Sequence, residues 1–333
     1  MTENIEEKEI IDVKQPVIGE FKPKRKFLSF VSAVSGKKIR LIKETAFIEG
    51  RKLSGMLERA KFKITTETPM KFRITKETLY TYEDLVSLSP HTLRVYPRVD
   101  IHIKVDRFEL QSNSDAQIQF RRDLFDNIVA HCFYPDTSNR LGFRTIIELS
   151  VQEKNPYQFL LDSHGLKIPC QYKEEELALL APYITVAENA KLPAPLAPTN
   201  PRPTVETLVN INSWIFDNIA YERRDSAHRH TSAEILKRES GSCRDFSTLL
   251  AETLRQNGLA TRLASGFVWE GDKPEEEKKA SSSMHAWVET YLPGAGWIGM
   301  DPTNGVLCDH HFVTTAVGRT ESDIAPVNGS YYS

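Results

Sequence analysis

The sequence has little cysteine, little net charge and no long apolar run, and each shortage excludes a class of protein. Four cysteines in 333 residues, without close paired spacing, exclude a disulfide-stabilised scaffold and favour a reducing, cytoplasmic setting. A net charge of −2 gives no electrostatic basis for nucleic-acid binding. No apolar run is long enough to span a membrane, and the acidic stretch 1–14 lacks the apolar segment of a secretion signal.

The length allows two domains with cores of useful size, and the composition divides the chain. Residues 1–69 match no clear pattern, and we expect an unassigned, disordered extension there. Residues 70–185 are rich in strand signals among turn residues, which predicts a β-rich N-terminal domain built as a sandwich. The proline-dense stretch 186–204 is typical of a stiff, extended linker. Residues 205–329 then form a second domain, and residues 330–333 end the chain.

The stretch Gly-Ser-Cys-Arg-Asp-Phe at 241–246 predicts the start of a helix with a cysteine at its first position. Ser242 and Asp245 have the spacing of a capping box, apolar residues follow at helical spacing, and Gly258 supplies a stop. A helix N-terminus carries roughly half a positive charge and unpaired N–H groups. Both favour a thiolate, so we expect the pKa of Cys243 to fall below about 8.5. The same N–H groups can bind an oxyanion.

A histidine and an aspartate lie at matching ends of a predicted hairpin. Residues 284–292 alternate as a strand, 293–296 form a turn, and 297–301 form a second strand. His285 begins the first strand and Asp301 ends the second, so both lie at the same end of an antiparallel pair. Asp301 can then accept a hydrogen bond from one ring nitrogen of His285 and leave the other nitrogen for Cys243. The register does not follow from the sequence.

Together these residues indicate a thiol nucleophile site that works through a thioester. A lone cysteine is more often a buried apolar residue, and a lone strand histidine more often makes a structural hydrogen bond. The combination favours catalysis by Cys243, His285 and Asp301. The backbone N–H of Cys243 would hold the oxyanion together with a second donor that the sequence does not name.

Three blocks of sequence carry a family resemblance: 241–246, His-Ala-Trp-Val-Glu at 285–289, and Gly-Met-Asp-Pro-Thr-Asn-Gly at 299–305. They resemble the transglutaminase-like superfamily, most of all its bacterial branch described as transglutaminase-like cysteine proteases. The matching covers roughly residues 221–329. Segments at 71–75, 80–82 and 86–94 resemble the β-rich N-terminal region that accompanies this branch. The resemblance implies a papain-like core in which Cys243 is the nucleophile, His285 the general base and acid, and Asp301 the orienting carboxylate.

We therefore expect an α+β protein in which an N-terminal β-sandwich precedes a papain-like, transglutaminase-like core with the nucleophile helix packed on an antiparallel sheet. The resemblance favours a cysteine-dependent acyl hydrolase, a peptidase or amidase, that acts on a protein or peptide substrate. Two alternatives stay open: transglutaminase-type transfer to a primary amine, and a protein-interaction module without catalysis. We expect no cofactor, no nucleic-acid partner and no membrane partner, and the sequence does not predict an oligomeric state.

Residues 308–311, Cys-Asp-His-His, resemble part of a metal site. No second cluster at ligand spacing accompanies them, and adjacent histidines on a strand point in different directions. We therefore predict no metal.

Relatives of the branch usually continue past the chain's last residues with further strand sequence. The sequence therefore leaves open whether an edge strand of the core sheet is missing at this end.

Overall fold

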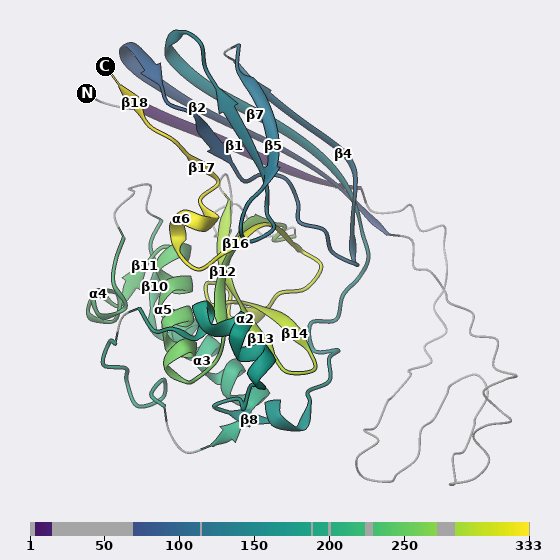
Figure 1. The fold of residues 1–333 in the computed structure, drawn as a ribbon, viewed down its shortest axis with the longest axis vertical. Coiled ribbons are helices and arrows are strands. Elements are labelled where there is room, and N and C mark those ends of the chain that lie inside the picture. The colour runs from purple at the N-terminus through teal and green to yellow at the C-terminus, as the bar shows by residue number, and fades with distance from the viewer. Residues whose placement is uncertain are drawn as a thin grey trace, which may run out of the picture. The chain divides into compact units, whose positions relative to one another are not determined.

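The computed structural model describes residues 4–14, 69–113, 115–187, 189–198, 201–223, 229–271 and 284–332. Strands of the N-terminal region and a core of helices and strands belong to one structural unit (Figure 1). The longer strands are β1 (Asn4–Lys14), β2 (Met70–Leu88), β4 (Ile103–Ser112), β5 (Gln117–Arg122), β6 (Ile128–Phe133), β7 (Thr137–Val151), β12 (Thr261–Val268), β13 (His285–Leu292), β14 (Gly296–Asp301) and β16 (Phe312–Gly318).

The remaining elements are short strands and the helices. The short strands are β3 (His91–Leu93), β8 (Lys167–Ile168), β9 (Arg202–Pro203), β10 (Ala220–Tyr221), β11 (Ser240–Gly241), β15 (Val306–Leu307), β17 (Val327–Asn328) and β18 (Tyr331–Tyr332). The helices are the 3₁₀ turn η1 (Ser163–Gly165) and α2 (Glu174–Ile184), α3 (Thr204–Asn218), α4 (Ser232–Arg238), α5 (Cys243–Gln256) and α6 (Glu321–Ile324).

Two antiparallel sheets make up the N-terminal region. One has the order β1-β2-β7-β4, with β18 paired to β2, and the other has the order β17-β3-β6-β5. The start of β2 alternates between exposed and buried side chains, so Phe72 and Ile74 point inward. They share an apolar core with residues of the second sheet, including Leu93 and Cys132. This packing confirms the predicted β-sandwich.

The first strand lies within a stretch that we expected to lack structure. Residues 4–14 form β1, which pairs antiparallel with β2 from Asn4 opposite Thr81 to Lys14 opposite Lys71. The prediction was wrong for these residues, because β-branched residues such as Ile10 and Val13 favour a strand even among charged neighbours. The rest of the predicted extension, residues 15–68, lies outside the described residues.

The core places helices against an antiparallel sheet of order β15-β14-β13-β12-β16. Helix α5 packs on β12 and β13, as Figure 1 shows. Its buried face, with Phe246, Leu250 and Leu254, meets Val288 and Met300 of the sheet in one apolar cluster. This arrangement confirms the predicted α+β fold, with the nucleophile helix packed on an antiparallel sheet.

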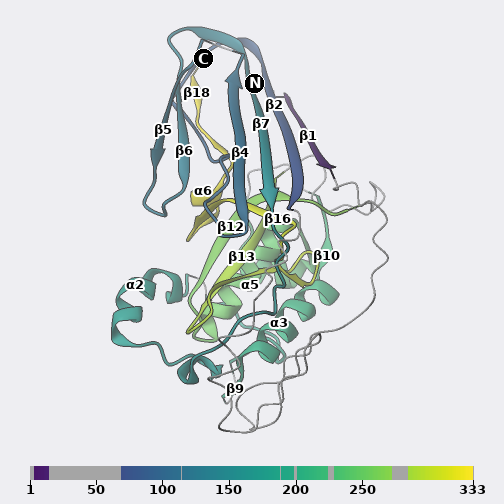
Figure 2. The ribbon, with the colours of Figure 1, turned by 90° about the vertical axis from the view of Figure 1, so that its right-hand side faces the viewer.

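The sandwich and the core share apolar contacts. The same buried cluster that holds the sandwich side chains also contains Phe267 and Val313 of the core sheet and Met284, which immediately precedes β13. The last described strands also return to the sandwich: β17 pairs with β3, and β18 pairs with β2 (Figure 2). The sequence assigned Val327 and Asn328 to the core, whereas their backbone completes a sandwich sheet.

Part of the proline-rich stretch packs on the core. Leu196 is fully buried there, and its carbonyl accepts a hydrogen bond from Asn257 Nδ2 at 2.9 Å. Arg202 donates to Asn257 Oδ1 at the same distance. These contacts anchor the described part of the stretch at the C-terminal end of α5. Among the described residues, no helix is both long and apolar enough to cross a membrane.

Candidate active site

Cys243 is the first residue of α5, and its side chain is partly exposed. The preceding turn is held by the buried carboxylate of Asp245, whose Oδ2 accepts the Ser242 backbone N–H at 2.7 Å and the Ser242 hydroxyl at 2.8 Å. At the other end, Gly258 adopts a φ of 76°, which ends the helix as the sequence predicted. The thiol therefore lies at a fixed, positively polarised helix end.

The predicted hairpin brings His285 and Asp301 together. Strands β13 and β14 pair antiparallel, from Val288 opposite Met300 to Leu292 opposite Gly296. The His285 side chain reaches Asp301 at the same end of the hairpin, with Nε2 3.0 Å from Asp301 Oδ2. Both side chains are completely buried, so this pair is shielded from water.

The Asp301 carboxylate has two more donors. The Thr303 backbone N–H donates to Oδ1 at 2.9 Å, and Asn304 Nδ2 donates to Oδ2 at 2.8 Å. The turn after β14 thus wraps around the carboxylate and fixes its orientation. Because an ionised carboxylate is an acceptor only, this surrounding favours the charged form and orients His285 with Nε2 toward Asp301.

The three side chains shift one another's pKa values. Burial alone would raise the pKa of the Cys243 thiol, but the nearby His285 ring and its charge bring the pKa below its ordinary value. Burial would lower the pKa of His285, but the charge and hydrogen bond of Asp301 raise it well above the ordinary value. Burial opposes the charge of Asp301 too, yet His285 holds the pKa of that carboxyl low. A low thiol pKa beside a high imidazole pKa favours a thiolate and an imidazolium.

Tyr221 lies next to the same helix end, and the sequence reasoning missed it. Strand β10 pairs parallel with β11, which places Tyr221 opposite Gly241, two residues before Cys243. The phenol ring packs against Phe246 of α5, with 6.4 Å between ring centroids. Burial raises the pKa of Tyr221, and the nearby Cys243 raises it further, so the hydroxyl keeps its proton. The sequence signal was weak, because a lone tyrosine after a helix has no special spacing to Cys243.

The cluster at residues 309–311 differs from its predicted geometry. These residues form a turn instead of a strand, and the rings of His310 and His311 lie 4.1 Å apart. Candidate ligand atoms of Asp309 and both histidines lie within 4.8 Å of one another, so the directional argument against a metal was wrong. The groups also have protein partners: His311 Nδ1 lies 2.9 Å from Asp309 Oδ1, and the Lys154 N–H donates to His310 Nδ1 at 3.4 Å.

Comparison with known proteins agrees with this architecture. The model of the transglutaminase-like superfamily matches residues 192–302, and that of the bacterial transglutaminase-like N-terminal region matches residues 72–149. These two matches confirm the family resemblance that the sequence motifs suggested, over residues 192–302 and 72–149. Both matched regions overlap those that the motifs indicated. The likeness supports cysteine-dependent hydrolase or transferase chemistry in general, whereas the roles of the individual site residues stay predictions.

Individual relatives extend over most of the chain. The uncharacterized proteins Rv2569c of Mycobacterium tuberculosis and Mb2599c of Mycobacterium bovis are each 26% identical over 79% of this chain and 88% of their own length. A crystal structure of a proposed cysteine protease from Cytophaga hutchinsonii superposes with a TM-score of 0.56 at 17% identity. That match covers 80% of this chain and 89% of the other, and it supports the shared fold.

Proposed function

We propose that this protein, whose residues 192–302 match the transglutaminase-like superfamily, is a cysteine-dependent acyl hydrolase that cleaves amide bonds of a protein or peptide substrate. The observation that carries the proposal is the buried pair of His285 and Asp301 beside the partly exposed Cys243 at a helix N-terminus. A binding surface alone has no need of a buried ion pair next to a thiol with a lowered pKa.

In the first half-reaction, the Cys243 thiolate attacks the amide carbonyl carbon and forms a tetrahedral oxyanion. His285, as the imidazolium, then gives its proton to the amide nitrogen. The C–N bond breaks, the amine leaves, and the acyl group stays on sulfur as a thioester. Asp301 stabilises the imidazolium before this transfer and keeps the ring oriented after it.

In the second half-reaction, the neutral His285 takes a proton from water as the water attacks the thioester carbonyl. The C–S bond breaks, the carboxylic acid product leaves, and Cys243 returns to the thiolate. The ion pair of the resting enzyme is restored, so atoms and charges balance over the cycle. Transfer to a primary amine differs only in the nucleophile of this half-reaction.

Two groups beside α5 fit the oxyanion. The backbone N–H of Cys243 is one of the unpaired donors of the helix N-terminus. The Tyr221 hydroxyl is the second donor that we assign, because β10 places Tyr221 opposite Gly241 and burial keeps the hydroxyl protonated. One preorganised donor of this kind contributes about 3 kcal/mol to transition-state stabilisation.

The test compares turnover of acyl donors by the wild type, Cys243→Ala and Cys308→Ala. Cys308 is a matched control because it is buried and burial raises the pKa of its thiol well above the ordinary value. We expect release of the acid and the amine by the wild type and the control, and no turnover by Cys243→Ala. Incorporation of an added primary amine would instead support the transferase.

The alternative of a protein-interaction module without catalysis predicts a different result in these assays. Absence of turnover with every donor, combined with slow alkylation of Cys243 by iodoacetamide near neutral pH, would overturn the enzyme proposal. Slow alkylation would mean that the thiolate is not favoured, in contradiction to the lowered pKa of Cys243.

A further inference from the structure

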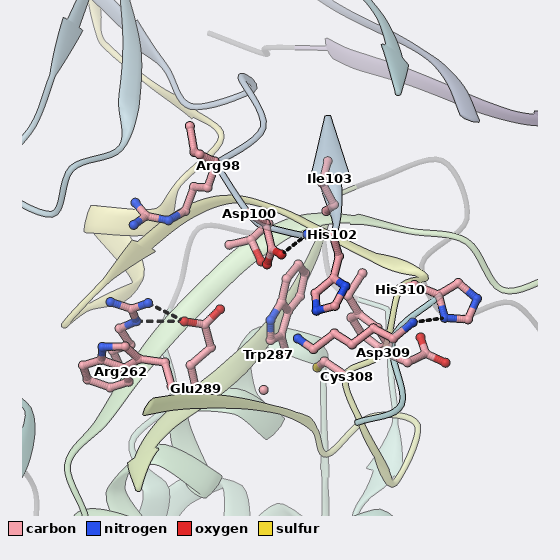
Figure 3. Close-up of a pocket in the computed structure, with 16 residues that line it drawn as sticks. Arg98, Asp100, His102, Ile103, Arg262, Trp287, Glu289, Cys308, Asp309 and His310 are labelled. Atoms are coloured by element: carbon pink, nitrogen blue, oxygen red, sulfur yellow. Dashed lines mark hydrogen bonds and ion pairs between the residues drawn. The ribbon is translucent and has the colours of Figure 1, made fainter. Parts of the chain in front are cut away.

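A cavity that Cys243 does not line lies between the sandwich side and the core sheet. It has a volume of about 180 Å³. Asp100, His102 and Lys154 line it from the segments that flank β4 and β7, and Trp287, Glu289 and Asp309 line it from the core. Figure 3 shows the His102 imidazole pointing into the space between Trp287 and Asp309. The cavity is thus built from both halves of the described structure.

Each carboxylate in the lining already has a partner. Glu289 Oε2 accepts N–H groups of Arg262 at 2.8 and 2.6 Å, and the Arg262 guanidinium lies 4.0 Å from the centre of the Trp297 ring. Asp309 Oδ1 accepts the His311 backbone N–H at 2.9 Å. Asp100 Oδ1 accepts the His102 backbone N–H at 2.8 Å. The negative charges of the cavity are therefore partly neutralised or turned toward the protein.

The positive side of the lining is not balanced in the same way. Within the described part of the chain, the Lys154 ammonium and the His102 ring have no hydrogen-bond or ion-pair partner, although both side chains are half-buried. The Arg98 guanidinium donates to neutral oxygens, Phe125 O at 3.0 Å and Asn127 Oδ1 at 2.6 Å, without an ion pair among the described residues. Half-buried cationic and donor groups without partners favour an anion.

The size of the cavity restricts the anion. A volume of about 180 Å³ is smaller than the roughly 300–1,000 Å³ of pockets for drug-sized ligands. It therefore accepts one small organic anion or one side chain, and no folded partner. A carboxylate can accept from Lys154 and His102 with its two oxygens, while the Trp287 wall offers an apolar surface to a short carbon chain.

We propose that this cavity is a binding site for one carboxylate group, held by Lys154 and His102. The carboxylate is presented either by a free small organic acid or by an acidic side chain or chain end of the substrate. The second source fits the position of the cavity, because the rings of Trp287 and His285 stack with 6.4 Å between centroids. Trp287 thus separates the carboxylate site from the triad by a single aromatic ring.

Calorimetric titration with glutarate at constant ionic strength tests the site, and Cys243→Ala serves as the parent chain so that turnover plays no part. We expect single-site binding that weakens about tenfold in Lys154→Met and in His102→Gln. Lys104→Met is the matched control, because the Lys104 side chain is 79% exposed and pairs with Asp106 on the sandwich. We expect its affinity to be unchanged.

No saturable binding of glutarate by the parent chain, or equal affinity in Lys154→Met and Lys104→Met, would overturn the proposal. Lys154 has no side-chain partner among the described residues, so Lys154→Met should keep the parent's melting temperature. His102→Gln offers an independent variant if Lys154→Met does not fold.

A kinetic comparison in the wild type identifies the source of the carboxylate, and this part rests on the proposed function. If the substrate presents the carboxylate, glutarate raises KM for donors with an acidic residue and leaves matched neutral donors unaffected. If the ligand is a free acid, both donors respond alike. Failure of all turnover would contradict the proposed function, whereas the calorimetric result would stand by itself.

Discussion

Replacing Asp301 by asparagine tests the geometry of the site with one isosteric change. The carboxylate accepts from three donors: His285 Nε2 and Asn304 Nδ2 at Oδ2, and the Thr303 N–H at Oδ1. Asparagine offers one oxygen and one NH₂ group in the same place. If the oxygen faces His285, the NH₂ group meets the Thr303 N–H, donor against donor.

If the NH₂ group faces His285 instead, it forces the ring proton onto Nδ1, so that His285 can no longer act as a base toward Cys243. Either orientation costs a buried hydrogen bond, about 2 kcal/mol, and removes a charge-assisted bond to the imidazolium, about 1 kcal/mol more than a neutral bond. The sum of about 3 kcal/mol corresponds to a loss of about 150-fold in kcat/KM.

The assay is steady-state turnover of Asp301→Asn, with Asp106→Asn as the control. Asp106 lies on the sandwich, where it pairs with Lys71 and Lys104, so its asparagine variant should stay within about threefold of the wild type. Turnover by Asp301→Asn within the same range, in a protein whose Cys243→Ala variant is inactive, would refute the reasoning. It would mean that Asp301 neither orients His285 nor stabilises its charge.

Three further predictions follow from the pKa shifts and from the contacts at the helix end. Iodoacetamide at neutral pH should label Cys243 before Cys308, because the first thiol has a lowered pKa and the second a raised one; peptide mapping that finds Cys308 labelled first would contradict this. Tyr221→Phe should reduce kcat by about 100-fold or more at an unchanged alkylation rate of Cys243, and an unchanged kcat would remove Tyr221 from the oxyanion site. The lowered pKa of Asp301 adds stability above the unfolded value of about 3.9 that is lost as the pH falls through the folded value, so the difference in unfolding free energy between wild type and Asp301→Asn should shrink in acid. Denaturant titrations that show a constant difference would contradict this.

The local features of the site could be predicted because they depend on short-range patterns. Ser242 and Asp245 cap the helix that starts at Cys243, and Gly258 ends it, since capping and a positive φ need only neighbouring residues. Alternation places His285 at the start of a strand, and the turn after it returns the chain to Asp301. A hairpin is a local structure, so its matching ends follow from its length.

Other features were missed because they depend on contacts between distant parts of the chain. The pairing of β10 with β11, which brings Tyr221 to the helix end, joins two segments that no sequence pattern aligns. The return of β17 and β18 to the sandwich is also non-local. The turn at residues 309–311 was misread as a strand, and this error reversed the expected direction of its two histidines.

By itself, the sequence determined the kind of chemistry and the three residues predicted to perform it, because a capped helix and a hairpin are specified by nearby side chains. The tertiary structure decided the surroundings of those residues. Burial of His285 and Asp301, the approach of Tyr221 and the cavity beside Trp287 each require elements far apart in sequence to pack together. Burial decides the charge states of these residues, because two charges that pair in a buried site shift each other's pKa values, whereas exposed residues would keep their ordinary values.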